Sequence, residues 1–319
     1  MAQKLIIDAD PGIGDAVAIA LALSDPELDV VGVTACAGRI AGPVATRNAQ
    51  AIVEELDPPK WPRLGASSGP AVSESIDYRA TAVTAIDLNG ENGLGDCLLR
   101  VAEMHHIRDS AKVLVELVRN SPDEITILTL GPLTNVDMAC ELDPEFFGRI
   151  KGLFCLGGSV DRGGDVTAAA ELNMFADPQA ARNVLRSPAP KTLIPLEAAK
   201  KAVLTFDVFD RIFESATGPL KDLLSRLLPF ALRAHHQHLG LEGFPLNEVT
   251  ALCTLTTPRL FQTKRMAVDV ETSGELTRGM TVFDRRGTPQ WQTNIDVVRD
   301  VDAQGVLDYM HGIVRRSAG

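Results

Sequence analysis

Apolar and polar positions alternate along the chain in two distinct patterns. Short apolar runs rich in β-branched residues recur at 4–8, 29–35, 124–130, 150–158 and 191–196. The stretches between them have helical patterns, at 15–23, 46–56, 111–120 and 177–187. Continuous apolar strands separated by helices are typical of a parallel sheet that is covered on both faces. The pattern therefore predicts an α/β fold with a mostly parallel, open sheet and helices on both faces.

The pattern changes after about residue 200. Two helices are predicted at 206–215 and 218–240, and Pro219 suits the first turn of the second helix. Strand-like runs follow at 265–271, 279–287 and 294–300, before a last helix at 302–316. No repeat, low-complexity tract or linker interrupts the chain. We therefore expect one domain over residues 1–319, built on a mixed sheet.

Composition and charge narrow the class of protein. The chain has 319 residues, of which 45% are hydrophobic and 23% charged, an ordinary profile for a soluble globular protein. A net charge of −11 argues against nucleic acid or a membrane surface as a partner. Five cysteines without a C-x-x-C pair are typical of reduced thiols. Since the first apolar run is interrupted at Asp8, no signal peptide is predicted, and we expect a cytoplasmic protein.

Three carboxylates gather where the first predicted strand ends, in the stretch IIDADPGIGDA. Asp8 and Asp10 leave the strand on the same side, and Asp15 falls in the first turn of the next helix. Helix capping would explain Asp15 alone. Three acids at the carboxyl end of a strand, where open α/β sheets bind ligands, favour a cation site instead. Carboxylates without Cys or His partners indicate Ca²⁺ or Mg²⁺, with further oxygens from 131–135 or 246–248.

Three other interpretations of this turn fit less well. The dinucleotide-binding fingerprint would need a glycine where Val17 stands. No Lys-Ser/Thr pair follows the glycines of this turn, as a P-loop would require. The pattern D-x-D also occurs in haloacid-dehalogenase phosphotransferases, but Pro11 and Gly12 make a different turn.

The whole stretch DADPGIGDAVAIALAL resembles the signature D-x-D-P-G-x-D-D of the inosine-uridine-preferring nucleoside hydrolases. Further blocks resemble the same family nearly from end to end, at 36–40, 46–49, 89–95, 130–135, 157–181 and 244–251. The resemblance implies a nucleoside hydrolase-like fold and a homodimer or homotetramer. It also implies Ca²⁺-dependent hydrolysis of the N-glycosidic bond of a nucleoside, which releases base and ribose.

The resemblance assigns roles residue by residue. Asp10 would bind Ca²⁺ and take the proton from the attacking water. The remaining ligands of the ion would be Asp15, Glu248 and the carbonyl group of Leu130, with Asp8 as a supporting acid. The sugar would be bound by Glu171 and Asn173 of the A-E-x-N block and by Asp165, which replaces an Asn that contacts the 5′-hydroxyl.

The same comparison shows departures from the family pattern. The fourth acid of the signature, which would contact the ribose hydroxyls, is Gly14; Arg39 replaces an Asn and Asn89 a His. At the C-terminal part of the site, the His-Asp pair of the family is replaced by Asn247 and Glu248. Glu248 retains a carboxylate on a longer arm, whereas Asn247 cannot deliver a proton to the leaving base. These departures leave an alternative function open, a catalytically impaired relative that binds a sugar-like ligand through calcium.

Two interpretations are open for the histidines at 235–238 and for Arg39. His235, His236 and His238 suit the last turns of a helix, but one of them, His235 or His238 above all, could face the substrate and replace the lost proton donor. Arg39 could pair with Asp8 or Asp15, or could contact the sugar or an anionic substituent on it. His105 and His106 follow a helical pattern and are predicted at the surface.

Overall fold

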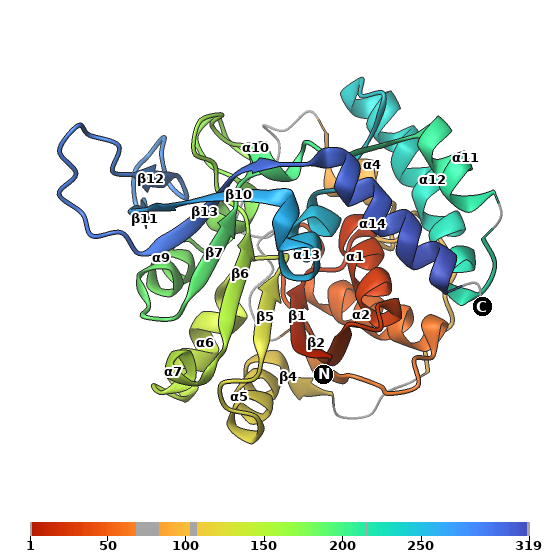
Figure 1. Cartoon of the computed structure of the whole chain (residues 1–319), viewed down its shortest axis with the longest axis horizontal. Coiled ribbons are helices and arrows are strands. Elements are labelled where there is room, and N and C mark those ends of the chain that lie inside the picture. The colour runs from red at the N-terminus through yellow and green to blue at the C-terminus, as the bar shows by residue number, and fades with distance from the viewer. Residues whose placement is uncertain (1, 68–82, 103–106, 215, 318–319) are drawn as a thin grey trace.

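A nine-stranded sheet forms the centre of the molecule (Figure 1). The computed structural model describes residues 2–67, 83–102, 107–214 and 216–317, so His105 and His106 lie outside the described residues. The strand order is β10-β13-β7-β6-β5-β1-β2-β3-β4. The strands are β1 (Gln3–Ala9), β2 (Leu28–Ala35), β3 (Arg63–Ala66), β4 (Arg108–Asp109), β5 (Thr126–Thr129), β6 (Gly152–Leu156), β7 (Lys191–Ile194), β10 (Phe261–Met266) and β13 (Ile295–Val301). Their pairing is parallel except between β10 and β13, which confirms a mostly parallel, mixed sheet.

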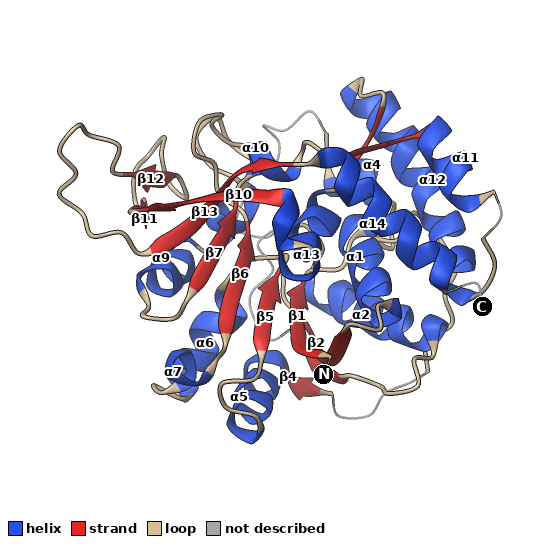
Figure 2. Cartoon of the chain, in the orientation of Figure 1, coloured by secondary structure: helices blue, strands red, loops and turns tan. Residues whose placement is uncertain are grey.

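Helices cover both faces of this sheet, as the apolar runs predict (Figure 2). One face carries α1 (Ile13–Ser24), α2 (Gly42–Leu56), α12 (Pro219–Leu239), α13 (Asn247–Thr256) and α14 (Ala303–Arg316). The other carries α5 (Ser110–Asn120), α6 (Thr134–Leu142), α7 (Phe146–Arg149) and α9 (Pro178–Arg186). In β1, Leu5 and Ile7 pack into the apolar core on the face that carries α1, whereas Ile6 packs into the core on the face that carries α5. A strand buried on both sides needs the continuous apolar run that the sequence shows.

Short elements complete the chain. They are α4 (Ala85–Asn89), α8 (Leu172–Ala176), α10 (Leu196–Ala199), α11 (Phe206–Phe213) and the 3₁₀ turn Pro258–Leu260. Two small antiparallel pairs lie outside the main sheet, β8 (Val203–Thr205) with β9 (Gly243–Pro245), and β11 (Val268–Val270) with β12 (Thr281–Phe283). Among the described residues, no helix is long and apolar enough to cross a membrane.

The strand-like run predicted at 265–271 is divided between two sheets. β10 ends at Met266 in the main sheet, and β11 begins at Val268 beside β12. The side chain of Asn294 causes the break, because its Oδ1 accepts the Val268 N–H at 2.9 Å and its Nδ2 donates to the Val268 carbonyl oxygen at 3.0 Å. The strand-like run is therefore confirmed, as two short strands that belong to different sheets.

The direction in which successive strands are added to the sheet changes at β1. From β1 the chain builds β2, β3 and β4 on one side, and then returns to place β5 on the other side of β1. Connections leave in opposite directions at such a switch point, and the crevice between them is where open α/β sheets bind ligands. Asp10 directly follows β1, and Leu130 directly follows β5. The candidate site residues therefore meet at this point.

Candidate active site

Asp8, the inner acid of the motif, is held entirely within the core. Its Oδ1 accepts hydrogen bonds from the Thr34 hydroxyl at 2.5 Å and from Asn135 Nδ2 at 2.8 Å. Its Oδ2 has no hydrogen-bond partner among the described residues. Burial raises the pKa of Asp8 to about 7, although both hydrogen bonds oppose the shift. Asp8 thus joins the ends of β1 and β2 to α6.

Asp10 lies at the meeting point of three loops. Its Oδ2 accepts the backbone N–H of Ile40 at 3.2 Å. A Cβ on Gly38 or Gly131 would lie 2.4 or 2.5 Å from its carboxylate oxygens, so both loops approach Asp10 more closely than a larger residue would allow. Burial, with repulsion from Asp15 in second place, raises the pKa of Asp10 well above its usual range.

Asp15 and Glu248 belong to two helices that pack against each other. Asp15 lies in the first turn of α1, where its Oδ2 accepts the Gly12 N–H at 3.1 Å, while its buried Oδ1 has no partner in the described part of the chain. Glu248 lies in the first turn of α13. Burial raises the pKa of Asp15 to about 6. Burial and the charge of Asp15 raise the pKa of Glu248 to about 8. Among the described residues, the carboxylates of Asp10, Asp15 and Glu248 therefore have too little compensating positive charge around them.

Asn173 and Glu171 organise the loops after β5 and β6. Asn173 Nδ2 donates to the carbonyl oxygens of Leu130 at 2.7 Å and Leu156 at 3.0 Å. The Leu130 carbonyl oxygen retains a second lone pair. Glu171 caps α8: its Oε2 accepts the N–H groups of Gly158 at 2.8 Å and Met174 at 3.2 Å, and its Oε1 accepts that of Asn173 at 3.0 Å. Burial, and then the charge of Asp165, raises the pKa of Glu171 to about 7.

Arg39 pairs across the site with Asp165, and not with Asp8 or Asp15. Its Nη2 lies 3.9 Å from Asp165 Oδ2, which is too long for a hydrogen bond. Asp165 Oδ1 accepts the Leu172 N–H at 3.0 Å, which fixes that carboxylate. Of the two interpretations of Arg39, pairing with a neighbouring aspartate of the motif is therefore wrong.

Asn89 and Asn247 replace two expected histidines. Asn89 ends α4, and its Oδ1 accepts the Ile13 N–H at 3.0 Å, so it holds the start of α1 beside Asp15. Nothing in the sequence alone indicated this capping contact. Asn247 is the first residue of α13, and its buried Oδ1 has no hydrogen-bond partner within the described segments.

The histidines at the end of α12 differ in their surroundings. The half-buried ring of His235 lies edge-on to Phe244, with 4.9 Å between ring centroids, and its Nδ1 lies 2.9 Å from the Ala231 carbonyl oxygen. Burial lowers the pKa of His235, and the charge of Arg39 lowers it further. His238 is exposed. Of the two, His235 therefore has the electrostatic connection to the candidate site.

A cation would meet oxygen donors here, although no group of three or more His, Cys, Asp or Glu side chains within the described ranges is arranged to hold a metal ion. Asp15 Oδ1, which has no hydrogen-bond partner among the described residues, and the mutual repulsion of the neighbouring carboxylates nevertheless fit a positive ion. All-oxygen donors suit a hard divalent cation.

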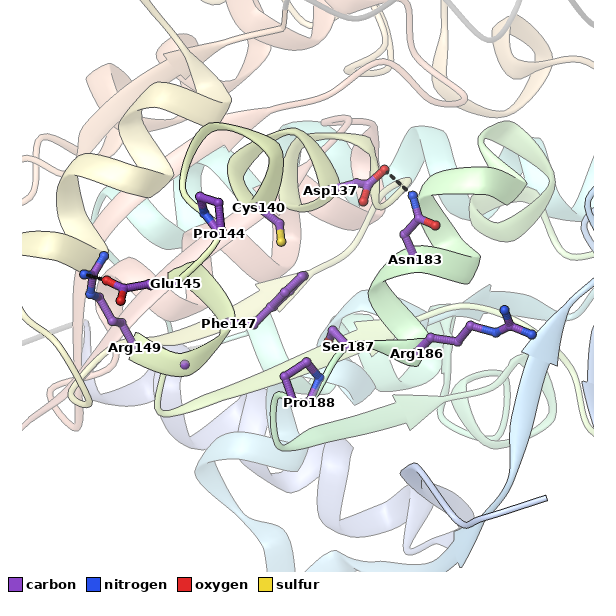
Figure 3. Close-up of a pocket in the computed structure, with 11 residues that line it drawn as sticks. Asp137, Cys140, Pro144, Glu145, Phe147, Arg149, Asn183, Arg186, Ser187 and Pro188 are labelled. Carbon is purple, nitrogen blue, oxygen red and sulfur yellow. Dashed lines mark hydrogen bonds and ion pairs between the residues drawn. The ribbon is translucent and has the colours of Figure 1, made fainter.

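A separate cavity of about 790 Å³ lies among α6, α7 and α9, at the amino ends of β6 and β7 (Figure 3). Its charged side chains already have partners. Arg149 Nη1 donates to Asp143 at 2.7 Å, and Arg186 donates to Asp269. Asp137 accepts a hydrogen bond from Asn183 at 3.1 Å. The charged side chains of this cavity are therefore already paired, unlike the carboxylates at the carboxyl ends of the strands.

Comparisons with known proteins agree with this geometry. The family described as inosine-uridine preferring nucleoside hydrolase matches residues 5–308. The pyrimidine-specific ribonucleoside hydrolase RihA of Escherichia coli is 33% identical over 312 residues, 97% of each chain. Among solved structures, the plant nucleoside hydrolase PpNRh1 has a TM-score of 0.88 at 26% identity, with 99% of each chain covered. A purine-preferring ribonucleoside hydrolase from Gardnerella vaginalis has a TM-score of 0.86 at 25% identity, again over 99% of each chain.

The match spans almost the whole chain and includes the carboxylates at the switch point of the sheet. The chain therefore belongs to the inosine-uridine preferring nucleoside hydrolase family, and its enzymatic activity is hydrolysis of the N-glycosidic bond of nucleosides.

Proposed function

We propose that the chain hydrolyses ribonucleosides in a calcium-dependent reaction, with Asp10 as the base that takes the proton from water. One observation carries this proposal: the buried carboxylate of Asp10 lies at the switch point of the sheet, under the electrostatic influence of Asp15 and held by the loops after β2 and β5. A carboxylate there can accept a proton and stabilise positive charge that develops on the sugar.

Asp10, Asp15, Glu248 and the Leu130 carbonyl group would hold the ion. Oδ1 of Asp15, which has no partner in the part of the chain that the structure describes, supports this assignment. The raised pKa values of the three acids support it too, since a divalent cation would compensate their charges. When bound, the cation lowers the pKa of the attacking water.

Asp10 would then act as a general base with a defined orientation. The Ile40 N–H donates to Oδ2, which leaves Oδ1 as the oxygen for the water proton. The sugar acquires oxocarbenium-like positive charge as the bond to the base breaks, and the surrounding carboxylates stabilise that charge.

The nucleobase would leave without a proton from the side chain at position 247. An amide side chain does not donate a proton at neutral pH, although Asn247 can form a hydrogen bond. We therefore expect that the ease with which the base leaves limits the rate on ordinary nucleosides. The relative RihA is a pyrimidine-specific ribonucleoside hydrolase, which makes uridine and cytidine the first substrates to test.

The test is a hydrolysis panel of uridine, cytidine, inosine and 2′-deoxyuridine, with purified chain in calcium or in chelator. Release of free base and reducing sugar in equal amounts, only with calcium, supports the proposal. Binding of nucleosides without hydrolysis of any of them would favour a sugar-binding relative instead. The family resemblance also predicts a homodimer or homotetramer, which light scattering on the same sample measures.

A further inference from the structure

Gly14 is the second residue of α1, between the Gly12 turn and Asp15. Its φ lies outside the left-handed range in which glycine is favoured, so the backbone there accepts any L residue. Alanine stabilises a helix more than glycine does. The local backbone therefore gives no reason for glycine at this position.

The reason lies on another helix. A Cβ built on Gly14 would lie 2.2 Å from Oε2, 2.5 Å from Cδ and 2.9 Å from Oε1 of Glu248. All three atoms of that carboxylate group thus lie over the Gly14 Cα. Glu248 comes from the first turn of α13, which packs on α1.

The Glu248 carboxylate therefore lies at the first turn of α1, beside the residue that directly precedes Asp15. A side chain at position 14 would occupy the same volume and would force the carboxylate away from Asp15.

We propose that Gly14 is a positioning residue, whose missing side chain admits the Glu248 carboxylate to the space beside Asp15. The carboxylate in the space beside position 14 in this way comes from α13. The inference rests on the proposed function in one respect: it takes Glu248 to be a ligand of the cation.

The test is a cycle of four proteins: the natural chain, Gly14→Ala, Glu248→Asp, and the two changes together. Calorimetry measures calcium affinity, and thermal unfolding is followed with and without calcium. Gly14→Ala weakens calcium binding about 10- to 100-fold, the range for residues that orient metal ligands. Aspartate at position 248 is one methylene shorter and withdraws from Gly14, so the added alanine has no further effect on affinity in that background.

Thermal unfolding gives a second readout. Gly14→Ala displaces the Glu248 carboxylate, so the rise in Tm that a fixed calcium concentration gives the natural chain becomes smaller in this variant. The matched control is Gly312→Ala in α14, where the new Cβ would lie 3.4 Å from the flexible end of Arg316. That variant raises Tm and leaves calcium affinity unchanged.

Each result decides the inference. Equal losses from Gly14→Ala in both backgrounds, or a calcium-dependent rise in Tm as large in Gly14→Ala as in Gly312→Ala, would overturn it. If Gly14→Ala does not fold, the double variant still folds when Glu248 is the obstacle, and its failure to fold would also contradict the inference. A natural chain that binds no calcium would refute the proposed cation site, whereas the Tm cycle without calcium would still decide the contact between Gly14 and Glu248.

Discussion

Arg39 and Asp165 form an ion pair that joins the loop after β2 to the loop after β6, with 3.9 Å between Nη2 and Oδ2. The guanidinium donates no hydrogen bond within the described residues. Burial raises the pKa of Asp10, Asp15 and Glu248, and the charge of Arg39 partly opposes that rise. Arg39 therefore places a positive charge near the proposed cation.

Removing that charge will tighten calcium binding. We expect Arg39→Gln to raise calcium affinity about three- to tenfold, because two positive charges repel in a partly buried site. Asp165→Asn should have the opposite effect, since it removes a negative charge and frees Arg39 from its partner. Calorimetry measures both, and Arg47→Gln is the control, because it makes the same change in net charge at an exposed position of α2. Equal affinities in Arg39→Gln and Arg47→Gln would show that the guanidinium does not act on the ion.

Asp10→Asn will remove hydrolysis without unfolding the protein. Turnover should fall at least about 100-fold, the lower range for loss of a general base. Asparagine has almost the same shape and can still accept the Ile40 N–H, so Tm should change little. Asp8→Asn is the comparison, because Asp8 bonds to Thr34 and Asn135 within the core. If Asp8→Asn lowers turnover more than Asp10→Asn does, the base is Asp8.

Asn247 should make the rate depend strongly on the leaving group. Nitrophenyl riboside, whose departing group needs no proton, should be cleaved far faster than inosine. Asn247→His should raise the rate on inosine selectively, because it introduces a group that can donate a proton near neutral pH. Equal rates on both substrates in the natural chain would reveal another acid. Replacing His235, His236 and His238 one at a time by Ala would then locate it as a selective loss on inosine.

Tyr309→Phe will destabilise the chain without affecting catalysis. The Tyr309 hydroxyl donates to Oδ2 of Asp25 at 2.7 Å, and Asp25 is 4% exposed at the end of α1. Loss of this bond leaves a buried carboxylate oxygen unpaired, which costs about 1–3 kcal/mol of unfolding free energy. Denaturant unfolding measures the loss, and unchanged turnover on uridine serves as the control. An unfolding free energy equal to that of the natural chain would show that water replaces the hydroxyl.

Much of the fold follows from local patterns. The apolar run before Asp8 predicts β1 because a central parallel strand is buried on both sides, and Pro219 begins α12 because its fixed φ suits a first helical turn. The division at Ala267 could not be predicted, because the hydrogen bonds that cause it come from Asn294, far along the chain.

For the candidate site too, the sequence could predict one part and not the other. The Asp10 cluster could be recognised, since its acids are close in sequence and end a strand. The contact between Gly14 and Glu248 joins residues on two helices that are distant in the chain, so only packing reveals it. The bond from Asn173 to the Leu130 carbonyl oxygen likewise depends on how β5 and β6 end side by side.

The most direct measurement is the rate of uridine hydrolysis as calcium is returned to the chelated protein, with bound calcium measured in the same samples. Free uracil and reducing sugar should appear in equal amounts, and the rate should rise in proportion to the fraction of chain that holds calcium. Glu248→Gln should bind calcium more weakly and require more of it for the same rate, because its amide carries no charge. Full hydrolysis in chelator with no metal bound, or a calcium-saturated chain that hydrolyses no nucleoside, would contradict a calcium-dependent hydrolase built on Asp10, Asp15 and Glu248.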